Sequence, residues 1–193
     1  MKLLILYIVL VFAAAGCDIL QTRNAEAPNQ PRSNYEQAVT PQILVSNLVN
    51  SLEDKDVQNY ISCLIDSSFS DKNFIFSPSS GALSQYPFLL NDWRLRDEEQ
   101  YFKNLITKVS DQNPITLSLT NELYSPQGDS LIYTATYSIN VPNVETEPKD
   151  YQGDLRFNMV RDSRSIWVIY YWQDTKSTAL PSWSELKGKF YYS

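Results

Sequence analysis

The sequence predicts an α+β domain in which three helices come first and a curved four-stranded antiparallel sheet follows. Between residues 41 and 109, apolar residues recur at the spacings of three and four that place them on one face of a helix. Between residues 115 and 173, apolar and polar residues alternate instead, which is typical of half-buried strands. Short turn sequences separate the alternating segments, so neighbouring strands should be antiparallel.

Two short helices are expected at the start of the domain. Thr40-Pro41 combines an N-cap residue with a proline favoured in the first helical turn, and an apolar stripe then continues to Leu52. After the charged segment 54–56, the apolar residues from Val57 to Leu64 predict a second helix. Both helices should bury one face in the same core.

Two capping boxes predict further helix starts. Asp97 and Gln100 match the pattern with Asp97 as the N-cap, and an apolar stripe from residue 102 to residue 109 predicts the third helix after them. Ser182 and Glu185 repeat the pattern near the end of the chain, where Gly188 is the expected stop. A single helical turn should therefore close one end of the sheet.

Short connections join the strands of the expected sheet. Residues 126–129 and 162–164 have the composition of turns, and the acidic segment 143–150 should be an exposed loop. Phe74-Ile75-Phe76 predicts a separate short strand. The four strands of the sheet are expected at residues 115–119, 131–141, 151–159 and 166–173.

The last of these strands is apolar on both faces, which favours a central position or an interface. Strict alternation would place Trp167 and Trp172 on opposite faces of the sheet. A bulge near Tyr170-Tyr171 would bring the two tryptophans to one face and bend the sheet more sharply.

The N-terminus has the pattern of an export signal. Lys2 precedes an uncharged apolar run, Leu3 to Ala15, which is shorter than the roughly 20 residues of a membrane span. The run ends in Ala-Ala-Gly-Cys17, which resembles the bacterial lipoprotein lipobox. That resemblance implies that the thiol of Cys17 is lipidated and that the chain is cut just before it. An ordinary secretory signal with an accidental cysteine is the alternative.

The expected organisation is a cleaved signal peptide at 1–16, a lipidated cysteine with a flexible tether at 17–39, and one domain at 40–193. The protein would then be lipid-anchored in the bacterial cell envelope, on the periplasmic or the outer face, with the membrane leaflet left open. Because Lys2 would leave with the signal, 15 basic and 22 acidic side chains would remain, a formal charge of −7 rather than −6. This balance disfavours nucleic acid as a partner.

The composition also limits the available chemistry. The chain has no histidine, which excludes Ser-His-Asp and Cys-His nucleophiles and histidine-containing zinc sites. It has no glycine-rich phosphate-binding motif, and we expect no metal and no cofactor. Cys17 and Cys63 are its only cysteines, so acylation of Cys17 would leave no disulfide, and Cys63 is expected to be a partly buried apolar residue.

The order of three helices and a curved antiparallel sheet resembles the nuclear transport factor 2-like (NTF2-like) superfamily of cone-shaped domains. The C-terminal runs 167–174 and 182–188, together with the lipobox, resemble a group of uncharacterised bacterial lipoproteins with such a domain. The resemblance covers roughly residues 40–190. It implies a fold but no single activity, because the superfamily includes isomerases, dehydratases, transport adaptors and non-enzymatic modules.

A non-catalytic binding or accessory module is the first functional hypothesis. The chain has 25 aromatic residues, and several should point into the cone, where an apolar ligand or a segment of an envelope protein could bind. Each of them is also explained by ordinary core packing. The candidate ligand-binding residues are Tyr60, Phe76, Trp93, Tyr133, Phe157 and Trp172.

Two alternatives remain open. A histidine-free isomerase or dehydratase would pair a carboxylate base in the pocket with a hydroxyl donor, and Asp174 is the candidate base, although it also fits a turn or helix-capping role. A homodimer would instead use the outer face of the sheet, as is common in this superfamily. The candidate interface residues are Trp167, Ile169, Thr134 and Thr136, with Tyr171 beside them.

Overall fold

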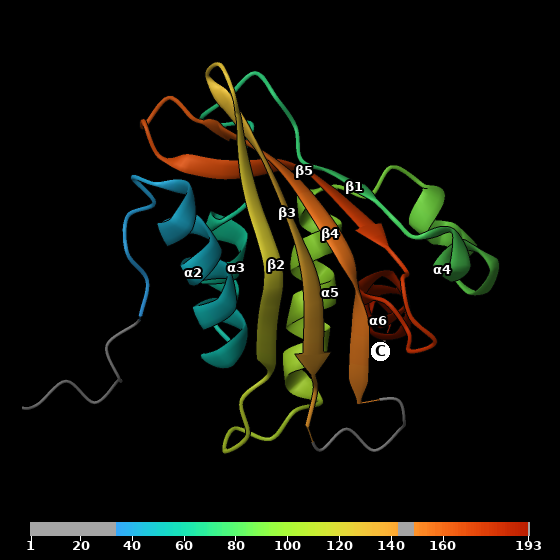
Figure 1. The fold of residues 1–193 in the computed structure, drawn as a ribbon. Helices are drawn as coiled ribbons and strands as arrows, with labels where there is room; N and C mark the ends of the chain where they lie inside the picture. Colours follow the sequence, from blue (N-terminus) through green and yellow to red (C-terminus); the bar gives the residue numbers. More distant parts are fainter. Residues whose placement is uncertain (1–33, 143–148, 193) are drawn as a thin grey trace, which may run out of the picture. The chain divides into compact units, whose positions relative to one another are not determined.

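A computed structural model describes residues 34–142 and 149–192 of the chain. In this part of the chain, a five-stranded sheet is covered on one face by helices (Figure 1). The expected signal segment, Cys17 and the expected tether up to residue 33 lie outside the described residues, as do residues 143–148 of the acidic segment. None of the helices in the described ranges has the length and apolar character needed to cross a membrane.

The first two helices begin where the sequence predicts. Helix α2 (Pro41–Glu53) is capped by Thr40, whose hydroxyl accepts a hydrogen bond from the Ile43 N–H at 3.3 Å. Helix α3 (Val57–Ser62) is capped by Asp56 in the same way, with a 3.0 Å bond from the Asn59 N–H. Both caps satisfy amide groups that a helix leaves without an internal partner.

The folded body starts before Thr40, because residues 34–39 pack along α2. The Glu36 N–H donates to the Asn47 side chain at 3.0 Å, and the Asn47 amide returns a 2.6 Å bond to the Glu36 carbonyl. Ala38 is buried, and its carbonyl accepts a 2.8 Å bond from the Trp167 N–H. These residues, assigned to the tether from the sequence, therefore belong to the domain.

The sheet has five strands rather than the four expected. The hairpins from β2 to β5 form the predicted antiparallel meander, but β1 adds to β5 in parallel and makes the sheet mixed. The extra pairing joins segments that are far apart in the sequence, so no turn between them could reveal it. The strands are β1 (Ile75–Ser77), β2 (Thr116–Gln127), β3 (Ser130–Asn140), β4 (Asp150–Arg161) and β5 (Trp167–Thr175), in the spatial order β1-β5-β4-β3-β2.

The expectation of three helices before the sheet is also wrong, although the helix after the sheet was expected. Two short helices, α4 (Ser80–Gln85) and η1 (Pro87–Leu90), occupy the irregular segment before α5 (Leu95–Thr107), and α6 (Trp183–Phe190) follows the sheet. The start of α5 is earlier than the capping box predicted. Asp97 is its third helical residue rather than its N-cap, and its carboxylate accepts a 2.9 Å bond from the Arg94 N–H.

Helix α6 begins after Ser182 as predicted, and the Glu185 carboxylate accepts a 2.6 Å bond from the Ser182 N–H. Gly188, however, is not the stop, because the helix continues through it to Phe190. A side chain at this position would collide with the Tyr86 ring, which packs directly on the glycine. Gly188 therefore permits close packing of α6 against the segment between α4 and η1.

Strand β5 contains a bulge where the sequence allowed one, so strict alternation does not hold along it. Asn158 of β4 pairs with Tyr171, whereas Met159 pairs with Ile169, so Tyr170 is an extra residue. The extra residue reverses the alternation of side chains on its N-terminal side. Ile169 therefore shares the helix-covered face with Trp172, and both are fully buried.

An alanine substitution distinguishes Gly188 from an ordinary helical glycine, because even a single methyl group should be too large there. We expect Gly188→Ala to lower the free energy of unfolding by about 1–3 kcal/mol, the range for overpacking a core. Gly81→Ala in α4 is the matched control, since its new Cβ would meet only the flexible Lys176 side chain at 3.3 Å. Urea unfolding of both variants gives the comparison, and equal stabilities would contradict the close packing.

Candidate functional site

The interior of the domain contains a buried ion pair that joins two helices. The Lys187 ammonium of α6 lies 2.7 Å and 2.8 Å from the two carboxylate oxygens of Glu98 in α5. Tyr60 O–H and Trp93 Nε1–H each donate a further 2.6 Å hydrogen bond to that carboxylate. Neither Glu98 nor Lys187 has any exposed surface, so protein donors surround the carboxylate completely.

Aromatic rings enclose the ammonium of Lys187. Its Nζ lies 3.6 Å from the ring centres of both Phe76 and Trp172, while Trp93 and Tyr101 are 5.9 Å and 5.8 Å away. Ring faces attract a cation at these distances. Burial lowers the pKa of Lys187 to about 8, although the neighbouring Glu98 carboxylate opposes this shift.

The strand pairing explains how the aromatic rings come together. Phe76 of β1 lies directly beside Trp172 of β5 in the parallel pair, and their rings meet edge to face at 5.7 Å. Phe157 of β4 is the next partner in the same row, with its ring 5.0 Å from that of Trp172. The row that forms one wall around the ammonium therefore depends on β1 joining the sheet.

A second buried network holds the start of α6. Asp174 accepts a 2.6 Å bond from the Tyr137 O–H and a 2.8 Å bond from the Ser184 N–H, and it also bonds the Ser184 hydroxyl. The Tyr137 oxygen in turn accepts a 2.6 Å bond from the Trp183 N–H. Both acceptor oxygens of Asp174 are engaged in anchoring the helix, which agrees with the helix-capping role.

Gly153 makes room for this second network. A Cβ at this position would lie 2.6 Å from the Tyr137 oxygen and 2.5 Å from the Thr175 carbonyl. Burial and the adjacent Asp174 carboxylate raise the pKa of Tyr137, so its hydroxyl remains a proton donor across the physiological range.

The six candidate ligand-binding residues lie together in the core. The most exposed of them, Phe76, shows 4% of its surface, and their rings stack on one another or on neighbours such as Phe102. A ligand at this position would have to displace protein side chains. These six residues are Tyr60, Phe76, Trp93, Tyr133, Phe157 and Trp172.

The candidate interface residues lie on different faces of the sheet. Thr134 and Thr136 face away from the helices, whereas Ile169 is fully buried on the helix-covered face and Trp167 is half-buried beside Arg161, whose guanidinium lies 5.3 Å from its ring centre. Their grouping into one patch is therefore wrong. The bulge at Tyr170 is the physical reason, since it reverses the alternation on which the grouping was based.

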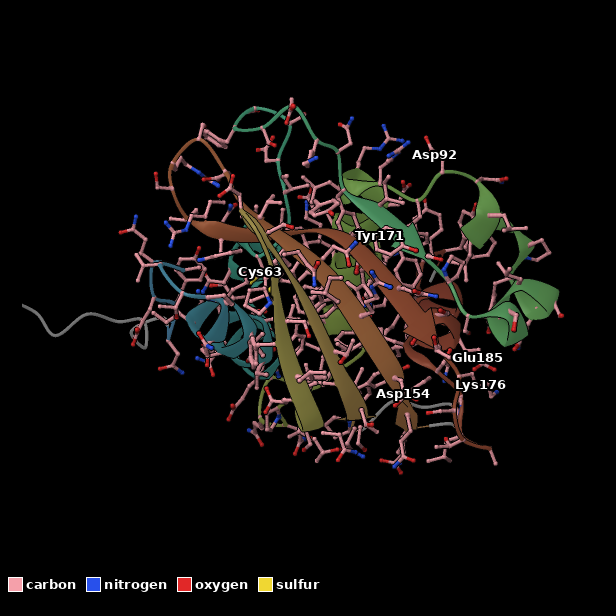
Figure 2. All side chains as sticks on the ribbon, turned by 45° about the horizontal axis from the view of Figure 1, so that its top comes forward. Cys63, Asp92, Asp154, Tyr171, Lys176 and Glu185 are labelled. Atoms are coloured by element: carbon pink, nitrogen blue, oxygen red, sulfur yellow. The ribbon has the colours of Figure 1, made fainter. Side chains whose placement is uncertain are left out.

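The uncovered face of the sheet is polar and shallow at its centre. A depression of about 290 Å³ lies there, and Thr136 donates a 2.8 Å bond to the Asp154 carboxylate within it. The register places Tyr171 on the same face, further along the sheet (Figure 2). At one end of β5, Lys176 and Glu185 form an ion pair at 2.9 Å (Figure 2).

The sequence analysis missed Glu98 and Lys187, although a signal for both was present. Glu98 lies four residues before Phe102, on the apolar stripe of α5. Lys187 lies four residues after Trp183, on the buried stripe of α6. One acidic and one basic residue, each alone on an otherwise apolar helix face, indicate a buried pair.

The cysteine and acidic residues form no metal site among residues 34–142 and 149–192, where no group of three or more could hold a metal ion. Cys63 is fully buried at the end of α3, and burial raises the pKa of its thiol. Cys63 is therefore an apolar core residue, as expected, but it is fully rather than partly buried.

No profile of a known protein family matches the sequence, and no curated protein matches it. Several solved structures are similar in fold. A candidate dehydratase of the NTF2-like family from Streptomyces avermitilis is 12% identical, with a TM-score of 0.55, over 78% of this chain and 100% of the other. A candidate aromatic ring hydroxylase from Novosphingobium aromaticivorans is 11% identical, with a TM-score of 0.55, over 78% and 96%.

An NTF2-like protein from Cytophaga hutchinsonii is 10% identical to this chain, with a TM-score of 0.51 over 70% of this chain and 93% of the other. These neighbours and the five-stranded sheet show that the chain has an NTF2-like α+β fold. At such low identities the similarity extends to the fold alone, so the activities named for these neighbours are not assigned to this chain.

Replacing only one residue of the Lys187–Glu98 pair should lower the free energy of unfolding far more, per substitution, than replacing both residues together. We expect Lys187→Met or Glu98→Gln alone to lower the free energy of unfolding by about 3–5 kcal/mol, because the remaining polar group is left buried without its partner. The double variant should lose clearly less than the sum of the two. Urea unfolding of all four proteins completes the cycle, and additive losses would show that the two groups do not interact.

Proposed function

We propose that the protein is a membrane-anchored bacterial lipoprotein that acts as a non-catalytic binding or accessory module in the cell envelope. The filled interior is the observation that carries this proposal. Protein groups occupy the carboxylates of both Glu98 and Asp174, and the aromatic residues between them are buried. A catalyst needs a carboxylate or hydroxyl that a substrate can reach, and the interior formed by residues 34–142 and 149–192 offers none.

The anchoring part of the proposal rests on the N-terminal sequence. A positive residue, a short apolar run and the Ala-Ala-Gly-Cys17 ending support lipidation of Cys17. A domain held at the membrane in this way would meet its partner through the outer surface. The uncovered face of the sheet offers such a surface, with exposed apolar residues at its edges, Leu123 on β2 and Ile75 on β1. An envelope protein or a second copy of the chain is the proposed partner class.

An isomerase or dehydratase is the second candidate. Two buried carboxylate–tyrosine pairs favour it, Tyr60 with Glu98 and Tyr137 with Asp174, since this is the donor and acceptor set of histidine-free proton transfer. One structural neighbour is also a candidate dehydratase. Catalysis at Glu98 would require Lys187 to leave the carboxylate and a cavity to open beside it.

The lipidation proposal can be tested by counting thiols in the protein purified from bacterial membranes. If Cys17 carries a lipid on its sulfur, the native protein should show no reactive thiol, and the denatured protein should show one, Cys63, which folding buries. Cys17→Ser should move the protein out of the membrane fraction or leave its signal uncut.

Cys63→Ser is the matched control for this experiment. It should remain in the membrane fraction and show no thiol before or after denaturation. A reactive native thiol in the wild type, or a Cys17→Ser variant that is processed and still held at the membrane, would overturn the proposal.

A further inference from the structure

We infer that the interior of this domain is a binding site for an alkylammonium ion and that Lys187 of α6 occupies this site as an internal ligand. The inference is independent of the lipid anchor and of the partner proposed above. It rests on the arrangement of a carboxylate and aromatic ring faces around a single ammonium group.

The site has the two components that recognise an organic cation. Both oxygens of Glu98 lie within 2.8 Å of the ammonium and supply its counter-charge. Phe76 and Trp172 present their rings at 3.6 Å, so the cation is held between two aromatic faces. Trp93 contacts both components of the site, since its ring lies 5.9 Å from the Lys187 ammonium and its indole N–H donates a hydrogen bond to the Glu98 carboxylate.

The carboxylate is fixed by groups other than the lysine. Tyr60 and Trp93 donate to its two oxygens from α3 and from the segment before α5, and neither group belongs to α6. The rings of Phe76 and Trp172 are likewise held by the β1–β5 pairing. The carboxylate and the Phe76 ring are therefore positioned from outside α6, whereas α6 contributes the ammonium and the Trp183 ring, which packs on Trp172 at 4.5 Å.

A simple salt bridge and a cation-binding site predict different responses when the lysine side chain is removed. Lys187→Ala deletes three methylene groups and the ammonium, which together have the size of n-propylammonium. If the site selects a cation, added propylammonium should enter the space and restore the lost contacts. A cavity that is merely apolar would take up 1-propanol, which has the same shape without the charge, equally well or better.

The experiment measures the unfolding temperature of full-length Lys187→Ala at pH 7 with increasing propylammonium chloride, 1-propanol or sodium chloride. We expect propylammonium to raise the unfolding temperature by several degrees, with an apparent affinity at least ten times that of 1-propanol. Wild-type protein should not respond, because its site is full.

Two further variants control the comparison. Lys187→Ala combined with Glu98→Gln should lose the preference for the amine, since the counter-charge is gone. Lys103→Ala removes an exposed lysine of α5, which pairs with Glu99 on the surface, and should show no stabilisation by either additive.

Equal stabilisation by propylammonium and 1-propanol, or none by either, would overturn the inference. If Lys187→Ala does not fold unaided, the same additives are compared during refolding from urea. Recovery of folded protein with propylammonium alone would support the site, whereas equal recovery with both additives, or none with either, would refute it.

Discussion

Lys187 and Glu98 meet where α5, α6 and the β1–β5 side of the sheet come together. Taking each charge out of water costs several kcal/mol, and mutual attraction offsets this cost only when the geometry is good and the remaining hydrogen bonds are made. Tyr60 and Trp93 complete the bonds of the carboxylate, and the ring of Trp172 borders the ammonium. The pair thereby fixes the position of α6, and α6 fills the space that would otherwise open between the helices and the sheet.

The two ends of α6 are held by different kinds of contact. At its start, Asp174 accepts hydrogen bonds from Ser184 and the Tyr137 oxygen accepts one from the Trp183 N–H, and Gly153 leaves space for them. Near its end, Gly188 lets the Tyr86 ring pack against the helix backbone. An interior closed in this way leaves the uncovered face of the sheet as the surface on which the proposed partner would bind.

Local sequence patterns were sufficient to predict structural features that depend on contacts between residues close together in the chain. The cap at Thr40 is an example, whereas the bulge at Tyr170 was considered only as a way to bring Trp167 and Trp172 to one face. The β1–β5 pairing could not be predicted, because the strand of Ile75–Ser77 is short and its partner is far away in the chain. The start of α5 was misplaced because a carboxylate at the third helical position can serve the N-cap amide as Asp97 does.

The buried pair was not predicted, because the expected apolar stripe of α5 began at Phe102, after Glu98, and Lys187 was not considered as part of the buried face of α6.

Detection of the lysine ammonium by ¹⁵N nuclear magnetic resonance at pH 6.5 tests the closed interior most directly. The account predicts one sharp ammonium signal, shielded from exchange with water and absent in Lys187→Met, because Glu98 and the surrounding rings exclude solvent. An ammonium of Lys187 that exchanges as fast as those of surface lysines would show that the interior is open.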